Sequence, residues 1–112
     1  MENLNLKINS VNMFSVIWKY KIIPDYLEKF EYEYGPHGKW KKLFENSIDY
    51  MGSFLHRDNE EANVYLVIDI WKSKETYTEF IEKNIEDYQK TSLEFEYLYE
   101  SEERIGIFDS VE

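Results

Sequence analysis

The fold of this chain is decided by residues 63–71, which read NVYLVIDIW. Apolar and β-branched residues occupy both alternating sets of side chains in this stretch, a pattern typical of a β-strand that is covered on both faces. Residues 13–22 predict a second long strand by the same alternation. One face of that second strand carries Phe14, Val16, Trp18, Tyr20 and Ile22. Both strands therefore require packing partners on each side of the sheet.

Helical patterns separate the strands along the chain. Pro24 suits the first turn of a helix because its missing N–H has no intrahelical partner there, and Gly35 with Pro36 ends that helix. Ser73 is placed as the N-cap of a long helix. Residues 91–99 fit either a strand or a short helix, of which we favour the helix. The complete pattern predicts helices at residues 24–34, 38–46 and 74–89, and two further strands at 50–57 and 104–108.

The order of these elements predicts an α+β domain of the ferredoxin-like β-α-β-β-α-β type, with its helices on one face of the sheet. We expect residues 13–112 to form this single domain and residues 1–12 to form a polar amino-terminal arm. The helices can cover only one face, although the other face is also apolar. We therefore expect a homodimer in which the sheets of two copies meet face to face and enclose a cavity.

Composition excludes several classes of function. The net charge of −10 repels nucleic acids and anionic membrane surfaces, so neither is expected as a partner. The chain has no Cys and only two His, which excludes disulfides and thiolate sites and predicts no metal. No apolar stretch reaches the roughly 20 residues needed to span a bilayer, and the amino terminus lacks the pattern of a signal peptide. We therefore expect a cytoplasmic protein.

Several short motifs give the sequence a family likeness. They are VIWKYKIIP at residues 16–24, YGPHGKW at 34–40, YMG at 50–52, LHRD at 55–58, YLVIDIWKS at 65–73 and ERIGIF at 103–108. With Tyr77 and Phe80, these motifs resemble the antibiotic-biosynthesis monooxygenase family over residues 13–108. The resemblance implies a dimeric α/β barrel. Members of the family include cofactor-free oxygenases of polycyclic phenols and quinols, haem-degrading enzymes and proteins of no known activity, so the resemblance narrows the fold more than the function.

The haem-degrading branch of that family uses an Asn on the first strand, a Trp on the third strand and a His on the helix that follows. Trp71 matches the Trp of this pattern. The first strand offers Trp18 or Ile17 where the Asn would lie, and no His follows Lys72. Haem degradation of the familiar kind is therefore not expected.

Asp69 is the main candidate for a catalytic residue. It shares a strand face with aromatic and apolar residues, and desolvation there would raise its pKa and prepare it as a general base. The alternative is a structural role, in which Asp69 makes a buried hydrogen bond to the backbone or a Tyr hydroxyl, or pairs with Arg57 or Lys19. His56, near the end of the second strand, is the second catalytic candidate, since an imidazole can exchange protons near neutral pH. A partly exposed surface histidine is its alternative.

Four aromatic residues are candidates for holding a planar ligand by stacking. They are Trp18, Tyr20, Tyr65 and Trp71. Packing in the core or at the dimer interface is the alternative for these side chains.

Together with these residues, the resemblance implies a monooxygenase-like oxidoreductase that acts, without a cofactor, on a small planar aromatic of the phenol or quinol type. Two alternatives stay open: a non-catalytic small-molecule-binding or interaction protein of the same fold, and a haem-binding protein with an unusual ligand.

Overall fold

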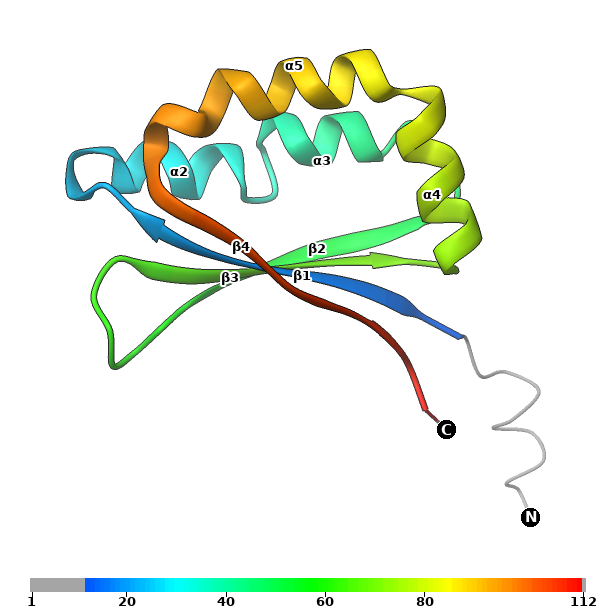
Figure 1. The fold of residues 1–112 in the computed structure, drawn as a ribbon, viewed down its shortest axis with the longest axis horizontal. Coiled ribbons are helices and arrows are strands. Elements are labelled where there is room, and N and C mark those ends of the chain that lie inside the picture. The colour runs from blue at the N-terminus through cyan, green and yellow to red at the C-terminus, as the bar shows by residue number, and fades with distance from the viewer. Residues whose placement is uncertain (1–11, 112) are drawn as a thin grey trace.

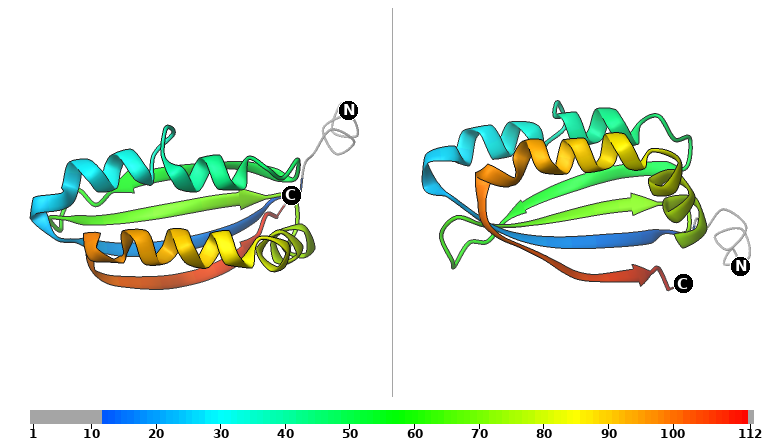
Figure 2. Two further views of the ribbon diagram at one scale, coloured as in Figure 1. Left: turned by 90° about the horizontal axis from the view of Figure 1, so that it is seen from above. Right: turned by 45° about the horizontal axis from the view of Figure 1, so that its top comes forward.

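A four-stranded antiparallel sheet with the strand order β2-β3-β1-β4 forms the base of the molecule in the computed structural model, which describes residues 12–111. The helices lie over one face of this sheet (Figures 1 and 2). In chain order the elements are β1 (Phe14–Ile22), η1 (Pro24–Tyr26), α2 (Leu27–Glu33), α3 (Lys39–Phe44), β2 (Tyr50–Arg57), β3 (Val64–Trp71), α4 (Lys74–Lys83), α5 (Ile85–Phe95), η2 (Glu96–Leu98) and β4 (Tyr99–Asp109). The predicted ferredoxin-like α+β fold is confirmed. The arm predicted at residues 1–12 lies outside the described residues except for Asn12.

The long helix predicted at residues 74–89 is instead two helices, α4 and α5. They are separated at Asn84, whose φ of −118° and ψ of 27° are not helical. The Asn84 side chain donates a hydrogen bond to the Phe80 carbonyl oxygen at 2.9 Å, and its backbone N–H donates to the same oxygen at 3.0 Å. These bonds satisfy a terminal carbonyl and end α4. Helix α4 starts as predicted, because the Ser73 hydroxyl accepts a hydrogen bond from the Thr76 N–H and caps the first turn.

The last strand is longer than the predicted 104–108. Strand β4 begins at Tyr99 and pairs along the whole of β1, from Ile22 at one end to Phe14 at the other. The preceding residues are helical through Leu98, which confirms the preference for a helix in all of the ambiguous segment except its last residue. Polar residues fill the first half of β4, so the sequence pattern does not show where the strand starts.

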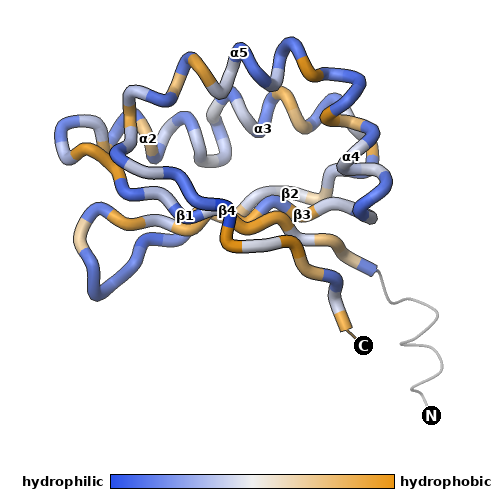
Figure 3. Tube along the Cα trace, in the orientation of Figure 1, coloured by the Kyte–Doolittle hydropathy of each residue, from blue (hydrophilic) through white to orange (hydrophobic). Residues whose placement is uncertain are grey.

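The face of the sheet that packs against the helices holds the hydrophobic core. Phe30, Trp71 and Leu98 are completely buried there, and Val16 and Ile22 lie on the same face of β1. Figure 3 shows hydrophobic residues along the strands, with hydrophilic residues in the turn between β2 and β3. No helix among the described residues is long and apolar enough to cross a membrane.

The opposite face of the sheet, here called the outer face, is not covered within the chain. Ile17, Phe54 and Ile68 are paired side by side across β1, β3 and β2 on this face. Leu66 and Phe108 add to it, and the exposed fractions of Phe54 and Phe108 are 55% and 48%. The two-faced apolar pattern of the sequence therefore corresponds to one face under the helices and one open face.

Candidate functional site

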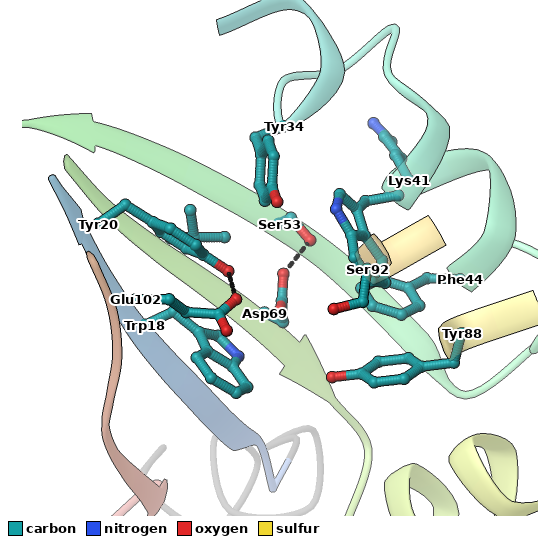
Figure 4. A pocket seen from close by; sticks show the side chains of 12 residues that line it. Trp18, Tyr20, Tyr34, Lys41, Phe44, Ser53, Asp69, Tyr88, Ser92 and Glu102 are labelled. Atoms are coloured by element: carbon teal, nitrogen blue, oxygen red, sulfur yellow. Dashed lines mark hydrogen bonds between the residues drawn. The ribbon is translucent and has the colours of Figure 1, made fainter. Parts of the chain in front are cut away.

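A cavity of about 240 Å³ lies between the sheet and the helices of a single chain. All four strands and helices α3 and α5 contribute to its wall, which Figure 4 shows from close by. The wall is formed by Trp18, Tyr20, Tyr34, Trp40, Lys41, Phe44, Ser53, Val67, Asp69, Tyr88, Ser92 and Glu102. The sequence suggested a cavity enclosed by the sheets of two copies but did not decide which strand face would line it; in the structure, this cavity lies on the helix-covered face of one chain. The helices stand far enough from the sheet to leave this space without a second copy.

Asp69 is the buried carboxylate of the cavity wall. Its exposed fraction is 8%, and Figure 4 shows it between Tyr20 and Glu102 on one side and Phe44 and Tyr88 on the other. Burial raises the pKa of Asp69 from the ordinary 3.8 to about 6, although a hydrogen bond from Ser53 opposes this rise. The carboxyl group therefore changes its charge near neutral pH, as a general base must.

The hydrogen bonds of Asp69 differ from the ones that the sequence suggested. The Ser53 hydroxyl donates to Asp69 Oδ1 at 2.6 Å, and Ser53 Oγ is 2.5 Å from the Tyr50 hydroxyl oxygen. Among the described residues, Asp69 forms no salt bridge: Arg57 pairs with Glu31 at 2.9 Å, and Lys19 pairs with Leu66 on the outer face of the sheet. No other described side chain or backbone N–H donates to Asp69. The second carboxylate oxygen, Oδ2, therefore accepts no hydrogen bond from the described residues.

A second carboxylate stands in the cavity wall on β4. Glu102 accepts a hydrogen bond from the Tyr20 hydroxyl at 2.7 Å, and these two residues face each other across β1 and β4. Burial raises the pKa of Tyr20 well above its usual value, and the nearby Tyr34 and Glu102 raise it further. Tyr20 therefore stays protonated and works as a fixed donor and an aromatic surface, not as a base.

Aromatic rings form most of the remaining wall. Trp40 packs edge-on against Tyr88, with 5.2 Å between ring centroids, and Phe44 lies 5.6 Å from Trp40. The Trp40 Nε1 atom is buried without an acceptor among the described residues. Burial raises the pKa values of Tyr34 and Tyr88, so both hydroxyls are neutral at physiological pH. The cavity thus presents flat apolar surfaces with a few polar groups, the usual composition of a small-molecule site.

The structure brings three of the residues selected from the sequence into the cavity wall: Asp69, Trp18 and Tyr20. Tyr65 lies on the same face of the sheet but outside the wall, where its hydroxyl donates to Glu31. Trp71 is completely buried behind the wall, 5.3 Å from Phe44 between ring centroids. Both residues are core residues of the helix-covered face, which is the packing alternative considered from the sequence.

His56 is not part of this cavity. It is exposed on β2 and pairs with Leu66 on the outer face. Within residues 12–111, no three His, Cys, Asp or Glu side chains lie close enough together to hold a metal ion.

Sequence reasoning missed several residues of the wall. Ser53 stands directly opposite Asp69 in the pairing of β2 with β3, but this register cannot be read from either strand alone. Glu102 belongs to the acidic run ESEE at residues 100–103, which looks like a solvated surface. Trp40 and Tyr88 followed a helical pattern, and only the packing of α3 on α5 reveals that both face the same space.

The fold of this chain matches solved structures, although no protein-family model and no curated protein matches its sequence. SnoaB, a cofactor-independent oxygenase from Streptomyces nogalater, is 15% identical with a TM-score of 0.61, over 92% of this chain and 96% of SnoaB. A proposed antibiotic biosynthesis monooxygenase from Bordetella bronchiseptica is 18% identical with a TM-score of 0.68, over 90% and 97% of the two chains. A similarly described protein from Caulobacter crescentus is 16% identical with a TM-score of 0.68, over 97% and 99%. The resemblance to antibiotic-biosynthesis monooxygenases is therefore confirmed at the level of the fold.

Proposed function

We propose that this protein is a cofactor-independent, monooxygenase-like enzyme that acts on a small planar phenol or quinol. The observation that carries the proposal is a buried carboxylate, Asp69, in the wall of an aromatic cavity. Its pKa is about 6, and its Oδ2 atom accepts no hydrogen bond from the described residues. The same fold occurs in SnoaB, whose description is that of a cofactor-independent oxygenase. Fold alone does not determine function, so the proposal depends on the residues of the cavity.

The size of the cavity favours a ligand of one or two fused rings. A dry cavity of about 150 Å³ holds benzene, and sites for drug-sized ligands occupy roughly 300–1,000 Å³. The cavity of about 240 Å³ lies between these sizes. A naphthol fits this range, whereas haem and phenols of three or four rings are too large for it.

The residues of the wall suit the oxidation of such a phenol by molecular oxygen. Asp69 accepts the phenolic proton, and the resulting phenolate passes one electron to oxygen to give a phenoxyl radical and superoxide. These two combine at a ring carbon to form a peroxide anion, to which Asp69 returns the phenolic proton. The resulting hydroperoxide loses hydroxide and the proton of the same ring carbon, which leaves a quinone and water. For 1-naphthol the balance is naphthol plus oxygen to naphthoquinone plus water. Trp18 and Tyr20 hold the ring and exclude water from it.

The outer face supports the further proposal of a homodimer. Phe54, Leu66, Ile68 and Phe108 form an open apolar surface on the side of the sheet away from the helices. A contiguous surface of this kind is typical of an interface, and a second copy offers an identical partner for it. Light scattering at micromolar concentration should give the mass of two chains, and a monomer mass would exclude this assembly.

Oxygen consumption with 1-naphthol or a naphthalene quinol tests the proposed reaction. Wild-type protein should consume oxygen above the spontaneous rate, and Asp69→Asn should reduce the rate by about 100-fold or more, the size of effect usual for a general base. Asp25→Asn is the matched control, because Asp25 is exposed outside the cavity and the change in charge is the same. If the protein binds the phenol but consumes no oxygen, the enzymatic function is rejected and the alternative of a non-catalytic binding protein is retained.

A further inference from the structure

Two hydroxyl groups connect the cavity carboxylate to the neighbouring strand. Ser53 has one hydroxyl proton, which it donates to Asp69 Oδ1 at 2.6 Å. Since this proton is used, the 2.5 Å contact between the Ser53 and Tyr50 oxygens requires Tyr50 to be the donor. The three side chains therefore form a directed chain, Tyr50 to Ser53 to Asp69, in which every donor points toward the carboxylate.

A β-bulge in β2 makes this chain sterically feasible. Tyr50 and Ser53 are three residues apart, so in a regular strand their side chains would lie on opposite faces of the sheet. Tyr50 pairs with Trp71 and Gly52 pairs with Ile70, which leaves Met51 as the extra residue. The resulting shift turns both Tyr50 and Ser53 toward the helices.

Gly52 provides the backbone conformation of the bulge. Its φ of +119° is one that residues with a side chain rarely adopt. Bulges often redirect a side chain beside an active site, and this one redirects Ser53 onto Asp69.

Packing holds Tyr50, the first donor of this hydrogen-bond chain, in place. The Tyr50 ring lies 5.4 Å from Phe44 and 5.2 Å from Trp71 between centroids. Trp71 is completely buried, so the Tyr50 ring has little freedom to turn away from Ser53. The Tyr50 hydroxyl is consequently a fixed donor to Ser53.

Building on the proposed function, in which Asp69 accepts the substrate proton, we propose that Ser53 and Tyr50 are positioning residues for this base. They engage Oδ1 and fix the plane of the carboxylate, so that Oδ2 faces the cavity and takes the proton. Without them the carboxylate could turn both oxygens into the cavity, and its charged form would lose its only hydrogen bond among the described residues.

Other titratable groups surround Asp69, but none of them bonds to it. They are Tyr20 from β1, Tyr34 after α2, Lys41 from α3, Tyr77 from α4, Tyr88 from α5, and Glu102 and Arg104 from β4. The protonation of Asp69 should therefore respond to Ser53 more strongly than to a change at any of these groups.

Carbon-13 NMR of the aspartate carboxyl carbons tests this arrangement, with the Asp69 signal assigned by its loss in Asp69→Asn. Ser53→Ala should raise the pH midpoint of Asp69 by about one to two pH units, because a hydrogen bond to a charged group is lost. Tyr50→Phe should raise it by a smaller amount, because Ser53 then loses the donor that polarises it. Ser53→Thr keeps the hydroxyl and should keep the midpoint.

The results of this titration separate the positioning role from the proposed reaction. If Ser53→Ala and Tyr50→Phe both leave the Asp69 midpoint unchanged, the positioning role is rejected. If the midpoints move as expected but wild-type protein consumes no oxygen with a naphthol, the positioning role stands and the proposed reaction fails. In an active enzyme, the rise of kcat with pH should move to higher pH in Ser53→Ala by the same amount as the NMR midpoint, while Ser53→Thr restores the wild-type profile.

Discussion

Replacing Asp69 by Asn should stabilise the protein at neutral pH and leave it little changed in acid. The pKa of Asp69 is about 6 in the folded chain, whereas the ordinary value of 3.8 applies to the unfolded chain. The folded state therefore binds the proton more tightly than the unfolded state does. The charged form consequently costs stability. This cost is absent below about pH 4, grows as the pH rises through about 6, and is complete above that pH. The difference between the two pKa values corresponds to about 3 kcal/mol at neutral pH.

The amide introduced by Asp69→Asn would keep an acceptor oxygen for the Ser53 hydroxyl and nearly the same volume, but it cannot carry the buried charge. Urea unfolding followed by tryptophan fluorescence, repeated between about pH 4 and pH 8, measures the free energy of unfolding of both proteins. The advantage of Asp69→Asn over wild type should increase by about 3 kcal/mol from acid to neutral pH. Asp25→Asn controls for the general effect of removing one negative charge from an acidic protein. An advantage that stays constant across this pH range would refute the reasoning that Asp69 is buried and poorly paired.

Three further changes test other parts of the structure. Trp18→Ala should weaken binding of a naphthol by about 2- to 10-fold in a fluorescence titration, because one stacking surface is lost; unchanged affinity would place the ligand elsewhere. Gly52→Ala should lower the free energy of unfolding by about 1–3 kcal/mol in urea unfolding, because alanine rarely adopts the positive φ of this position. An added Cβ would meet no atom there, so the backbone conformation alone causes the loss; no loss would show that the bulge is unstrained. Ile68→Lys should convert the proposed dimer to a monomer in light scattering, while Leu93→Lys on the exposed side of α5 should leave the mass unchanged; a dimer in both would exclude the outer face as the interface.

The strands could be predicted from the sequence because their side chains alternate regularly. The pattern at residues 63–71 located β3 to within one residue, and the Ser73 cap located the start of α4. Asn84 was not predicted as a break, because helical spacing of apolar residues continues across it. The helix ends there through local hydrogen bonds to Phe80, which a periodic pattern does not contain.

The candidate site could be predicted only in part. Asp69 could be selected from the sequence because a carboxylate is unusual in an otherwise apolar strand. Its hydrogen-bond partner Ser53 could not be selected, because a bulge that reverses the alternation of β2 places Ser53 opposite Asp69. Trp71 and Trp18 both lie on the helix-covered face, yet only Trp18 reaches the cavity. Periodicity assigns a face of the sheet to each residue, and the position of the helices along the strand then decides between core and cavity. That position is a property of tertiary packing.

In the proposed reaction, Asp69 initiates the oxidation of a phenol bound in the cavity. Mass spectrometry of the product formed from 1-naphthol under oxygen-18 gas tests it most directly. We expect wild-type protein and Asp25→Asn to form a naphthoquinone that contains one heavy oxygen atom from the gas, and Asp69→Asn to form it only at the spontaneous level. The absence of an enzyme-dependent quinone, or equal amounts from wild type and Asp69→Asn, would contradict it.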